Sequence, residues 1–360
     1  MNTRDTQYAL LKKCRIVFSA VLAAALFFSL APAHAQQSTM PVGYVTLKAE
    51  AGTGTVKKIT PISVPLYYTA SDKSPLAGSI TSLTATTLSD ASAGWTAGQL
   101  SAVASPYLIK ITSGAATGRT FLISTSTANT ATTVTIDAKD AAQTNLTTVG
   151  IVAGNEYEIF RCFTLVELFG TPTTSGVLGG TSASAGDSLV MGANGVLETY
   201  FYSTTYGRWT KVAPGSIDAT NTPVRPDSGI LYSRLAATDL TVLVPGKVST
   251  TNRMTMVKNS GTTILAQSWP VETTLLNLNI QQIPTWTANA SVNSADKVKI
   301  VTNGVSVTYW FDGANWRKQT LDFPIGDGDS IPAGSAVILE QLGAQSGYST
   351  LSQTKPYNVD

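Results

Sequence analysis

Hydrophobic and polar residues alternate with a period of two along most of this chain, and the alternating runs are short. Clear runs lie at 107–111, 120–124, 132–137, 156–160 and 305–311. Each is rich in β-branched and aromatic residues and is bounded by Gly, Asn, Asp or Ser, the usual signature of a strand between turns. The pattern therefore predicts an all-β protein.

One stretch of the chain occurs twice. The sequence DSLVMGANGVLETYFY at 187–202 returns at 296–311 as DKVKIVTNGVSVTYWF, with six identical positions. In both copies a Trp and then a Lys follow, as Trp209 with Lys211 and as Trp316 with Lys318. These are strand and turn residues, so the repeat predicts a duplicated scaffold.

A helical signal is confined to one short segment in each copy. Thr164 and Glu167 have the spacing of a capping box, and Gly170 can end the turn that they begin. A related segment lies at 274–278. The sequence thus predicts one short helix per repeat.

The repeat also predicts the division into domains. GYVTLKAEAG and PISVPL precede the first helical segment, and we match them to TVLVPGKVST and ILAQSWPV before the second. A long stretch after PISVPL has no counterpart in the second copy. We predict two duplicated β-sandwich or barrel-like domains with a small β-domain inserted in the first. The predicted boundaries are 36–77 plus 161–236 for the first domain, 78–160 for the insert and 237–360 for the second domain.

The beginning of the chain has the pattern of a secretory signal peptide. Lys12, Lys13 and Arg15 precede an apolar run at 16–30, and Ala33-His34-Ala35 follows as a cleavage site. The run is shorter than the ~20 residues of a spanning helix. We expect residues 1–35 to be removed and the mature chain to have no transmembrane span. The protein would then be exported, to the periplasm, the cell surface or the exterior.

The charge of the chain changes with its leader. Residues 1–35 hold four basic residues and Asp5, so their removal changes the formal net charge from +2 to −1. A near-neutral chain offers no general field for nucleic acid, which we do not expect as a partner. Charged residues make up 13% of the chain, against ~25% in ordinary globular proteins, a composition typical of extracellular β-proteins.

Several chemistries are absent from the predicted mature chain. It has no histidine, since His34 leaves with the leader, and its one cysteine, Cys162, can form no intrachain disulfide. Triads and zinc sites that need histidine are excluded, so we expect no enzyme. A carboxylate-dependent hydrolase is our third hypothesis, on the repeated Asp187 and Asp296; the alternative is that both form turns before a strand.

Aromatic and acidic residues supply two candidate sites. Asp322, Asp327 and Asp329 share a Gly-containing loop that could hold calcium or could be a solvated turn; we expect no other cofactor. The aromatic residues of the repeated strands are either core or a surface that stacks on sugars or on a neighbouring subunit. They are Tyr200, Tyr202, Trp209, Tyr309, Phe311 and Trp316.

The segments PVGYVTL, ISVPL, YLIKITSGAATGR, TLVELFG, GDSLVM and IPAGSAVI carry a resemblance across nearly the whole mature chain. Together they resemble an uncharacterised family of secreted bacterial β-rich proteins. Its members share a signal peptide and occur as multiple paralogues, without an established function. The short SGxxxGR hairpin is similar to β-modules of phage tail and fibre proteins. The resemblance implies export and no catalytic residues.

These observations favour an exported, non-enzymatic structural or interaction protein of the cell surface or extracellular matrix. Its expected partners are other surface proteins, further copies of itself, or a polysaccharide. The alternative is a carbohydrate-binding module or adhesin that uses the aromatic strands.

Overall fold

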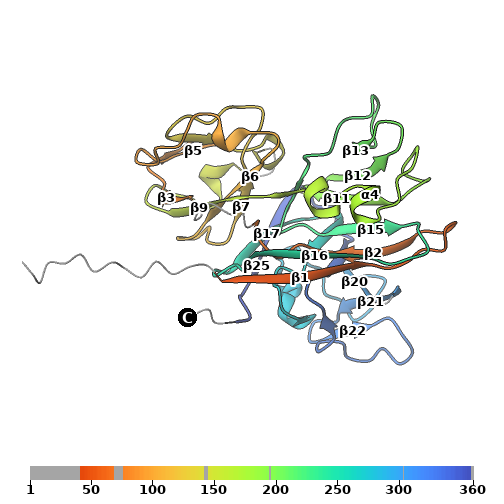
Figure 1. Ribbon diagram of the computed structural model, residues 1–360. Helices are drawn as coiled ribbons and strands as arrows, with labels where there is room; N and C mark the ends of the chain where they lie inside the picture. The colour runs from red at the N-terminus through yellow and green to blue at the C-terminus, as the bar shows by residue number, and fades with distance from the viewer. Residues whose placement is uncertain (1–40, 69–75, 142–144, 194–195, 303, 358–360) are drawn as a thin grey trace, which may run out of the picture. The chain divides into compact units, whose positions relative to one another are not determined.

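Strands are the main regular secondary structure of the protein (Figure 1). The computed structural model describes residues 41–68, 76–141, 145–193, 196–302 and 304–357. The predicted leader at 1–35 lies outside this range. Residues 40–360 form one compact unit. The prediction of an all-β protein is confirmed.

The first copy of the repeat forms an antiparallel five-stranded sheet in the order β13-β12-β11-β15-β2. Two separate strand pairs accompany it, β1 with β16 and β10 with β14. The strands of the sheet are β2 (Lys58–Ile62), β11 (Ser188–Ala193), β12 (Val196–Ser203), β13 (Arg208–Lys211) and β15 (Ile230–Arg234). The pairs are β1 (Val42–Ala49) with β16 (Leu240–Lys247), and β10 (Phe163–Thr164) with β14 (Pro223–Val224).

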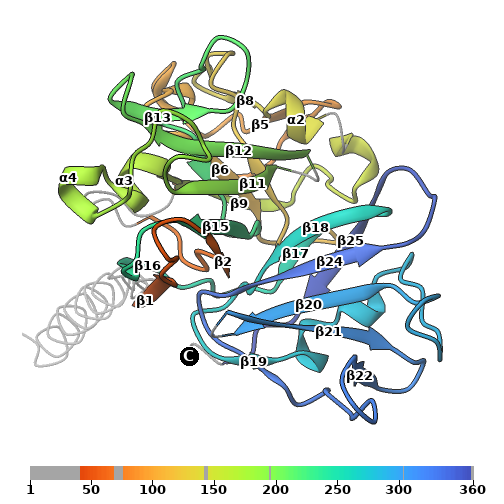
Figure 2. The same cartoon turned by 90° about the vertical axis from the view of Figure 1, so that its right-hand side faces the viewer.

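The second copy reproduces this topology element by element (Figure 2). Its sheet has the order β22-β21-β20-β24-β18, and β17 pairs with β25 as β19 pairs with β23. The sheet contains β18 (Gly261–Ala266), β20 (Lys297–Thr302), β21 (Val305–Phe311), β22 (Trp316–Lys318) and β24 (Ala336–Gln341). The pairs are β17 (Arg253–Lys258) with β25 (Tyr348–Gln353), and β19 (Thr273–Thr274) with β23 (Ser330–Ile331).

The identical residues of the repeat occupy equivalent positions in the two sheets. Tyr200 lies opposite Lys211 across β12 and β13, and Tyr309 lies opposite Lys318 across β21 and β22. The predicted Asn-Gly turns involve residues 194, 195 and 303, which lie outside the described residues. The duplicated scaffold that the sequence predicts is therefore present in both topology and register.

The segment between β2 and β10 folds into two further sheets, in the orders β3-β9-β6-β7 and β4-β5-β8. We call residues 76–161 the insert. Its elements are β3 (Leu76–Ser79), β4 (Ser82–Leu83), β5 (Thr87–Ser89), β6 (Tyr107–Ile111), β7 (Thr120–Leu122), β8 (Thr133–Thr135), α2 (Ala138–Ala141) and β9 (Glu156–Arg161).

Buried apolar side chains form three clusters. The first uses residues from 45–66 and 163–248, the second residues from 80–159, and the third residues from 257–351. Strand β16 was placed in the second domain by the predicted boundary at 237, yet it pairs with β1 and adds Leu240 and Val244 to the first cluster. Sequence comparison matched this stretch to 43–52, whereas the structure makes the two strands neighbours in one ribbon. The domain boundaries stay a prediction.

The helices are short, as predicted. Thr164 accepts a hydrogen bond from the Glu167 N–H, and the Glu167 carboxylate accepts one from the Thr164 N–H, so the capping box is present at α3 (Leu165–Phe169). A further helix, α4 (Pro172–Ser175), follows it. The second copy has only 3₁₀ turns at Leu276–Leu278 and Ile280–Gln282, because Asn279 adopts a left-handed conformation (φ 58°) between them. Two more 3₁₀ turns lie at Gln99–Ser101 and Leu146–Thr148.

Cys162 is buried, and burial raises the pKa of its thiol to about 12. Among the described residues no helix has the length and apolar character needed to cross a membrane.

Candidate functional site

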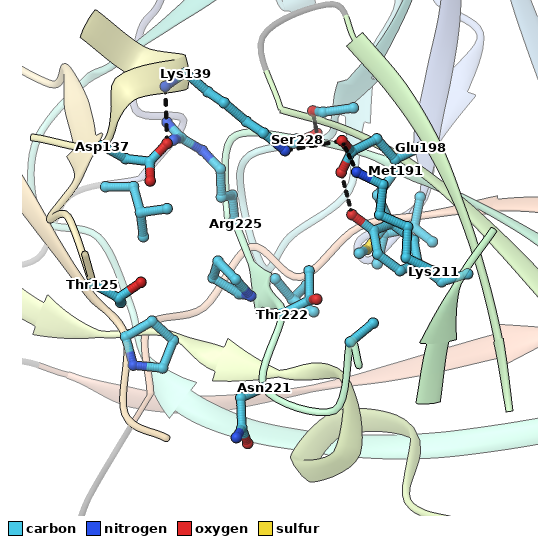
Figure 3. A pocket seen from close by; sticks show the side chains of 18 of the residues that line it. Thr125, Asp137, Lys139, Met191, Glu198, Lys211, Asn221, Thr222, Arg225 and Ser228 are labelled. Atoms are coloured by element: carbon cyan, nitrogen blue, oxygen red, sulfur yellow. Dashed lines mark hydrogen bonds and ion pairs between the residues drawn. The ribbon is translucent and has the colours of Figure 1, made fainter. Parts of the chain in front are cut away.

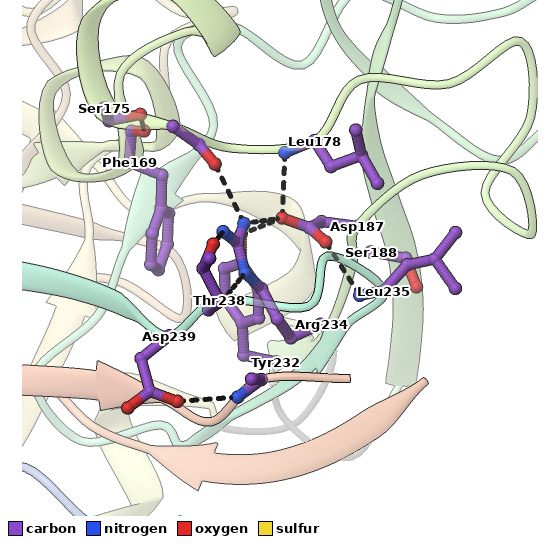
Figure 4. Close-up of polar contacts among 12 residues, drawn as sticks. Phe169, Ser175, Leu178, Asp187, Ser188, Tyr232, Arg234, Leu235, Thr238 and Asp239 are labelled. Atoms are coloured by element: carbon purple, nitrogen blue, oxygen red, sulfur yellow. Dashed lines mark hydrogen bonds and ion pairs between the residues drawn. The ribbon is translucent and has the colours of Figure 1, made fainter. Parts of the chain in front are cut away.

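The repeated aspartates lie inside the fold, where they tie separate segments together. Asp187 is 1% exposed and precedes β11. Its Oδ2 accepts hydrogen bonds from the Leu178 N–H (2.9 Å) and the Tyr232 hydroxyl (3.0 Å), and its Oδ1 accepts one from the Leu235 N–H (2.9 Å). Arg234 completes the cluster with an ion pair to Oδ2 (Figure 4). Burial, and then the nearby Asp187 charge, raise the pKa of Tyr232.

Asp296 makes the equivalent backbone contacts in the second copy. It is fully buried and accepts hydrogen bonds from the Thr287 N–H and the Leu342 N–H, both at 2.7 Å. Gln341 stands where the first copy has Arg234, and among the described residues Asp296 pairs with no arginine. Each aspartate therefore joins a loop nine residues upstream to the end of a sheet strand. Their role is wider than the predicted turn, and both carboxylates are buried.

The six aromatic residues proposed as a stacking surface lie in or against the cores. Tyr200, Trp209, Tyr309 and Trp316 are at most 5% exposed. Tyr202 and Phe311 are half-buried and pack against the first and third clusters. A sugar stacks on an open ring face, which the four buried rings do not present. We therefore interpret this set as core and do not propose it as a stacking surface, although Tyr200, whose hydroxyl donates to Glu198, also lines the cavity described below.

The acidic loop of the second copy is used within the fold. Asp327 accepts a hydrogen bond from the Trp316 N–H (2.6 Å), and Asp329 accepts one from the Tyr309 hydroxyl (2.5 Å) and pairs with Lys318 (2.9 Å). Asp322 is exposed. In the part of the chain that the structure describes, no group of three His, Cys, Asp or Glu residues is arranged to hold a metal ion.

A cavity of about 260 Å³ lies between the insert and the first five-stranded sheet (Figure 3). The insert contributes Leu122 and residues around α2, whereas β11 and β12 contribute Met191 and Glu198. The lining combines apolar side chains with ionised groups. The ionised residues are Asp137, Lys139, Asp140, Glu198, Lys211, Asp218 and Arg225.

Glu198 is the centre of the polar wall. Its Oε1 accepts hydrogen bonds from Lys211 (2.5 Å) and Lys139 (2.9 Å), and its Oε2 accepts one from the Tyr200 hydroxyl (2.6 Å). Burial favours the neutral acid, but these three donors outweigh it and lower the pKa of Glu198 to about 2. Lys139 reaches Glu198 from the insert, so this ion pair joins two walls of the cavity (Figure 3).

A buried arginine forms a second connection beside the cavity. Arg225 is 7% exposed and donates to both oxygens of Asp140 (2.8 and 2.9 Å) and to both oxygens of Asp227 (2.9 and 3.0 Å). Asp140 belongs to α2 of the insert and also accepts the Leu122 N–H. Burial opposes the charge of Arg225, but the two aspartates raise its pKa well above its usual value. This wall of the cavity is therefore held by a buried arginine that two aspartates share.

Sequence reasoning missed Glu198, Lys139 and Arg225. A usable signal was present at Glu198, because the second copy of the repeat has Val307 at the same place. A position where two copies of one scaffold differ in polarity is a candidate for function in one of them. No pattern in the sequence marks Lys139 or Arg225. Strand pairing and the position of the insert bring them to the cavity.

The chain matches no family model, no curated protein and no solved structure. The resemblance to secreted bacterial β-proteins stays a prediction, and the case for a function is built on the geometry described above.

Proposed function

We propose that this protein is an exported, non-enzymatic component of the cell surface or extracellular matrix that acts by associating with other copies of itself. Export follows from the predicted signal peptide. The use of Asp187 and Asp296 as buried ties supports a non-enzymatic role, because the hydrolase hypothesis rested on these two carboxylates.

The outer face of the β1–β16 ribbon carries this proposal. One face of the ribbon packs into the first core through residues such as Leu47 and Val244. The opposite face exposes Val42 (67%), Tyr44 (72%) and Leu243 (63%), with Pro245 directly across from Tyr44. Apolar side chains gathered on one exposed face favour contact with another surface.

The second copy of the ribbon is covered by the chain itself. Strand β17 occupies the place of β1, and Met254 donates its N–H to the Gly118 carbonyl (3.2 Å). The Arg119 side chain donates to the Thr350 hydroxyl on β25. A segment of the insert thus contacts the second ribbon, at Met254 on β17 and at Thr350 on β25. This contact supports a ribbon of this kind as a place for a neighbour.

A second copy of the chain is the occupant that fits the uncovered ribbon. At one end of this face Lys48 pairs with Asp239 (2.8 Å), and at the other end Lys247 stands across from Val42. The apolar residues lie between these two ends, and two such faces can pack about a twofold axis, as in closed homodimers.

Light scattering of the purified protein over a range of concentrations tests the proposal. We expect dimers or larger species that dissociate when Tyr44→Ser and Leu243→Ser are combined. Val305→Ser is the matched control, because Val305 is 64% exposed on β21 and lies outside the ribbon. A monomer at every concentration, or unchanged assembly in the double variant, would overturn it.

A further inference from the structure

We propose that the cavity between the insert and the first sheet binds a small neutral polyhydroxy ligand, about the size of one sugar ring. The inference is independent of self-association and concerns a different face of the protein. Pockets for drug-sized ligands are typically about 300–1,000 Å³. A cavity of about 260 Å³ is therefore suited to a ligand of one ring.

Hydroxyl groups both donate and accept hydrogen bonds, and the cavity lining offers both partners. Each of the Lys139 and Lys211 ammonium groups has three N–H donors and uses one on Glu198. On the acceptor side, Asp137 Oδ1 accepts the Lys139 N–H (2.9 Å), while within the described residues its Oδ2 accepts no hydrogen bond. The Thr125 hydroxyl also lines the cavity and can both donate and accept a hydrogen bond; among the described residues it makes none.

The charges of the lining favour a neutral ligand over an ion. Arg225 lies between Asp140 and Asp227, and this cluster keeps one excess negative charge, which the Leu122 N–H and the Thr120 hydroxyl help to stabilise. Asp218 pairs with Arg208 outside the cavity (3.3 Å). The remaining groups are two lysines and two carboxylates, which cancel. An anion would meet Glu198 and Asp137 as it approached the lysines, and a cation would meet the lysines.

The apolar part of the lining suits the C–H face of a sugar ring. Leu122, Met191, Val224 and Ile230 line the cavity, and Met191 can adjust its shape through its flexible thioether side chain. A ligand with hydroxyls on its rim and C–H groups on its face matches this division between polar and apolar walls.

The site belongs to the first copy of the repeat because the insert builds one wall of it. Lys139 comes from α2 of the insert, which has no counterpart in the second copy. There Val307 replaces Glu198, and Asp329 from a different loop takes over the contacts with Tyr309 and Lys318. Both copies of the repeat thus keep contacts among a Tyr, a Lys and a carboxylate, and in the first copy these residues line the cavity.

Titration calorimetry with D-glucose, D-galactose and N-acetyl-D-glucosamine tests this proposal, with D-glucuronate and D-glucosamine as charged counterparts. We expect at least one neutral sugar to bind with a dissociation constant on the order of 1 mM, as the small size of such a ligand implies. Thr125→Trp, which fills the cavity, should abolish binding. Val152→Trp is its control, since Val152 is 57% exposed on the insert and does not line the cavity.

Asp137→Asn keeps the shape of the cavity and should weaken binding about tenfold, the effect of losing one charge-assisted hydrogen bond. It keeps the proposal testable if Thr125→Trp does not fold. Failure of all three neutral sugars to bind would overturn the proposal. So would tighter binding of a charged counterpart, or equal binding by wild type and both cavity variants. Light scattering of the same samples reports self-association separately, so either proposal can fail without the other.

Discussion

Replacing Asp187 and Asp296 by asparagine, one at a time, separates two structural roles. Both residues accept backbone hydrogen bonds, and Asp187 also pairs with a buried arginine. Both carboxylates accept two backbone N–H groups from distant segments. Only Asp187 also neutralises a buried arginine, Arg234, whose side chain is 3% exposed. Asparagine keeps one acceptor oxygen and turns an amino group toward the other donors.

The two substitutions should differ in cost. Asp296→Asn loses one hydrogen bond to a charged acceptor and is expected to lower the free energy of unfolding by about 2 kcal/mol. Asp187→Asn loses an equivalent bond and leaves the Arg234 guanidinium buried without its carboxylate, which costs about 3–5 kcal/mol. Asp239→Asn is the control, because exposed Asp239 accepts one backbone N–H from Ala51 and pairs with Lys48 at the surface. We expect it to cost much less than either buried substitution, because solvent screens an exposed pair.

Urea unfolding of the three variants gives the free energies, and amide hydrogen exchange locates the effect. Exchange at Leu178 and Leu235 should accelerate in Asp187→Asn, and exchange at Thr287 and Leu342 in Asp296→Asn. Equal costs for the two buried aspartates would refute the assignment of the extra stability to the Arg234 pair. Loss of a measured turnover in Asp187→Asn with an unchanged melting temperature would refute the structural role altogether.

Three further predictions concern the cavity and its surroundings. Because the pKa of Glu198 is lowered from 4.5 to about 2 in the folded protein, its contribution to stability is present above pH 4.5 and is lost as the pH falls toward 2; acid unfolding curves should therefore be shallower in Glu198→Gln. Cys162, with its buried thiol and raised pKa, should resist alkylation in the native protein and react upon unfolding, which mass spectrometry of iodoacetamide-treated samples detects. Arg225→Leu leaves Asp140 and Asp227 buried without their cation, so it should destabilise the protein by about 3–5 kcal/mol and expose the insert to limited proteolysis; retention of wild-type stability and protease resistance would contradict this role.

Local sequence patterns were sufficient to predict elements that depend on interactions between neighbouring residues. The capping box at Thr164 and Glu167 needs only two side chains and the backbone between them, and it is present. The second helical segment was less well predicted, because a left-handed Asn279 divides it into two 3₁₀ turns. Sequence comparison matched β16 to β1 as equivalent strands of the two copies, because their patterns are similar. In the structure the two strands pair with each other in the first copy. Pattern comparison measures likeness, and neighbouring strands with one buried face have similar patterns.

The sequence by itself determined the class of the fold, its duplication and the buried character of Cys162, because period-two patterning and internal identity need no knowledge of distant contacts. It also indicated which residues recur, without showing what they do. Only the tertiary structure decided that Asp187 and Asp296 accept backbone N–H groups from two segments, and that the repeated aromatics are core. The cavity likewise depends on Lys139 meeting Glu198 across 59 positions of sequence. Such contacts form when strand pairing and the insert bring remote segments together, and no spacing along the chain encodes that proximity.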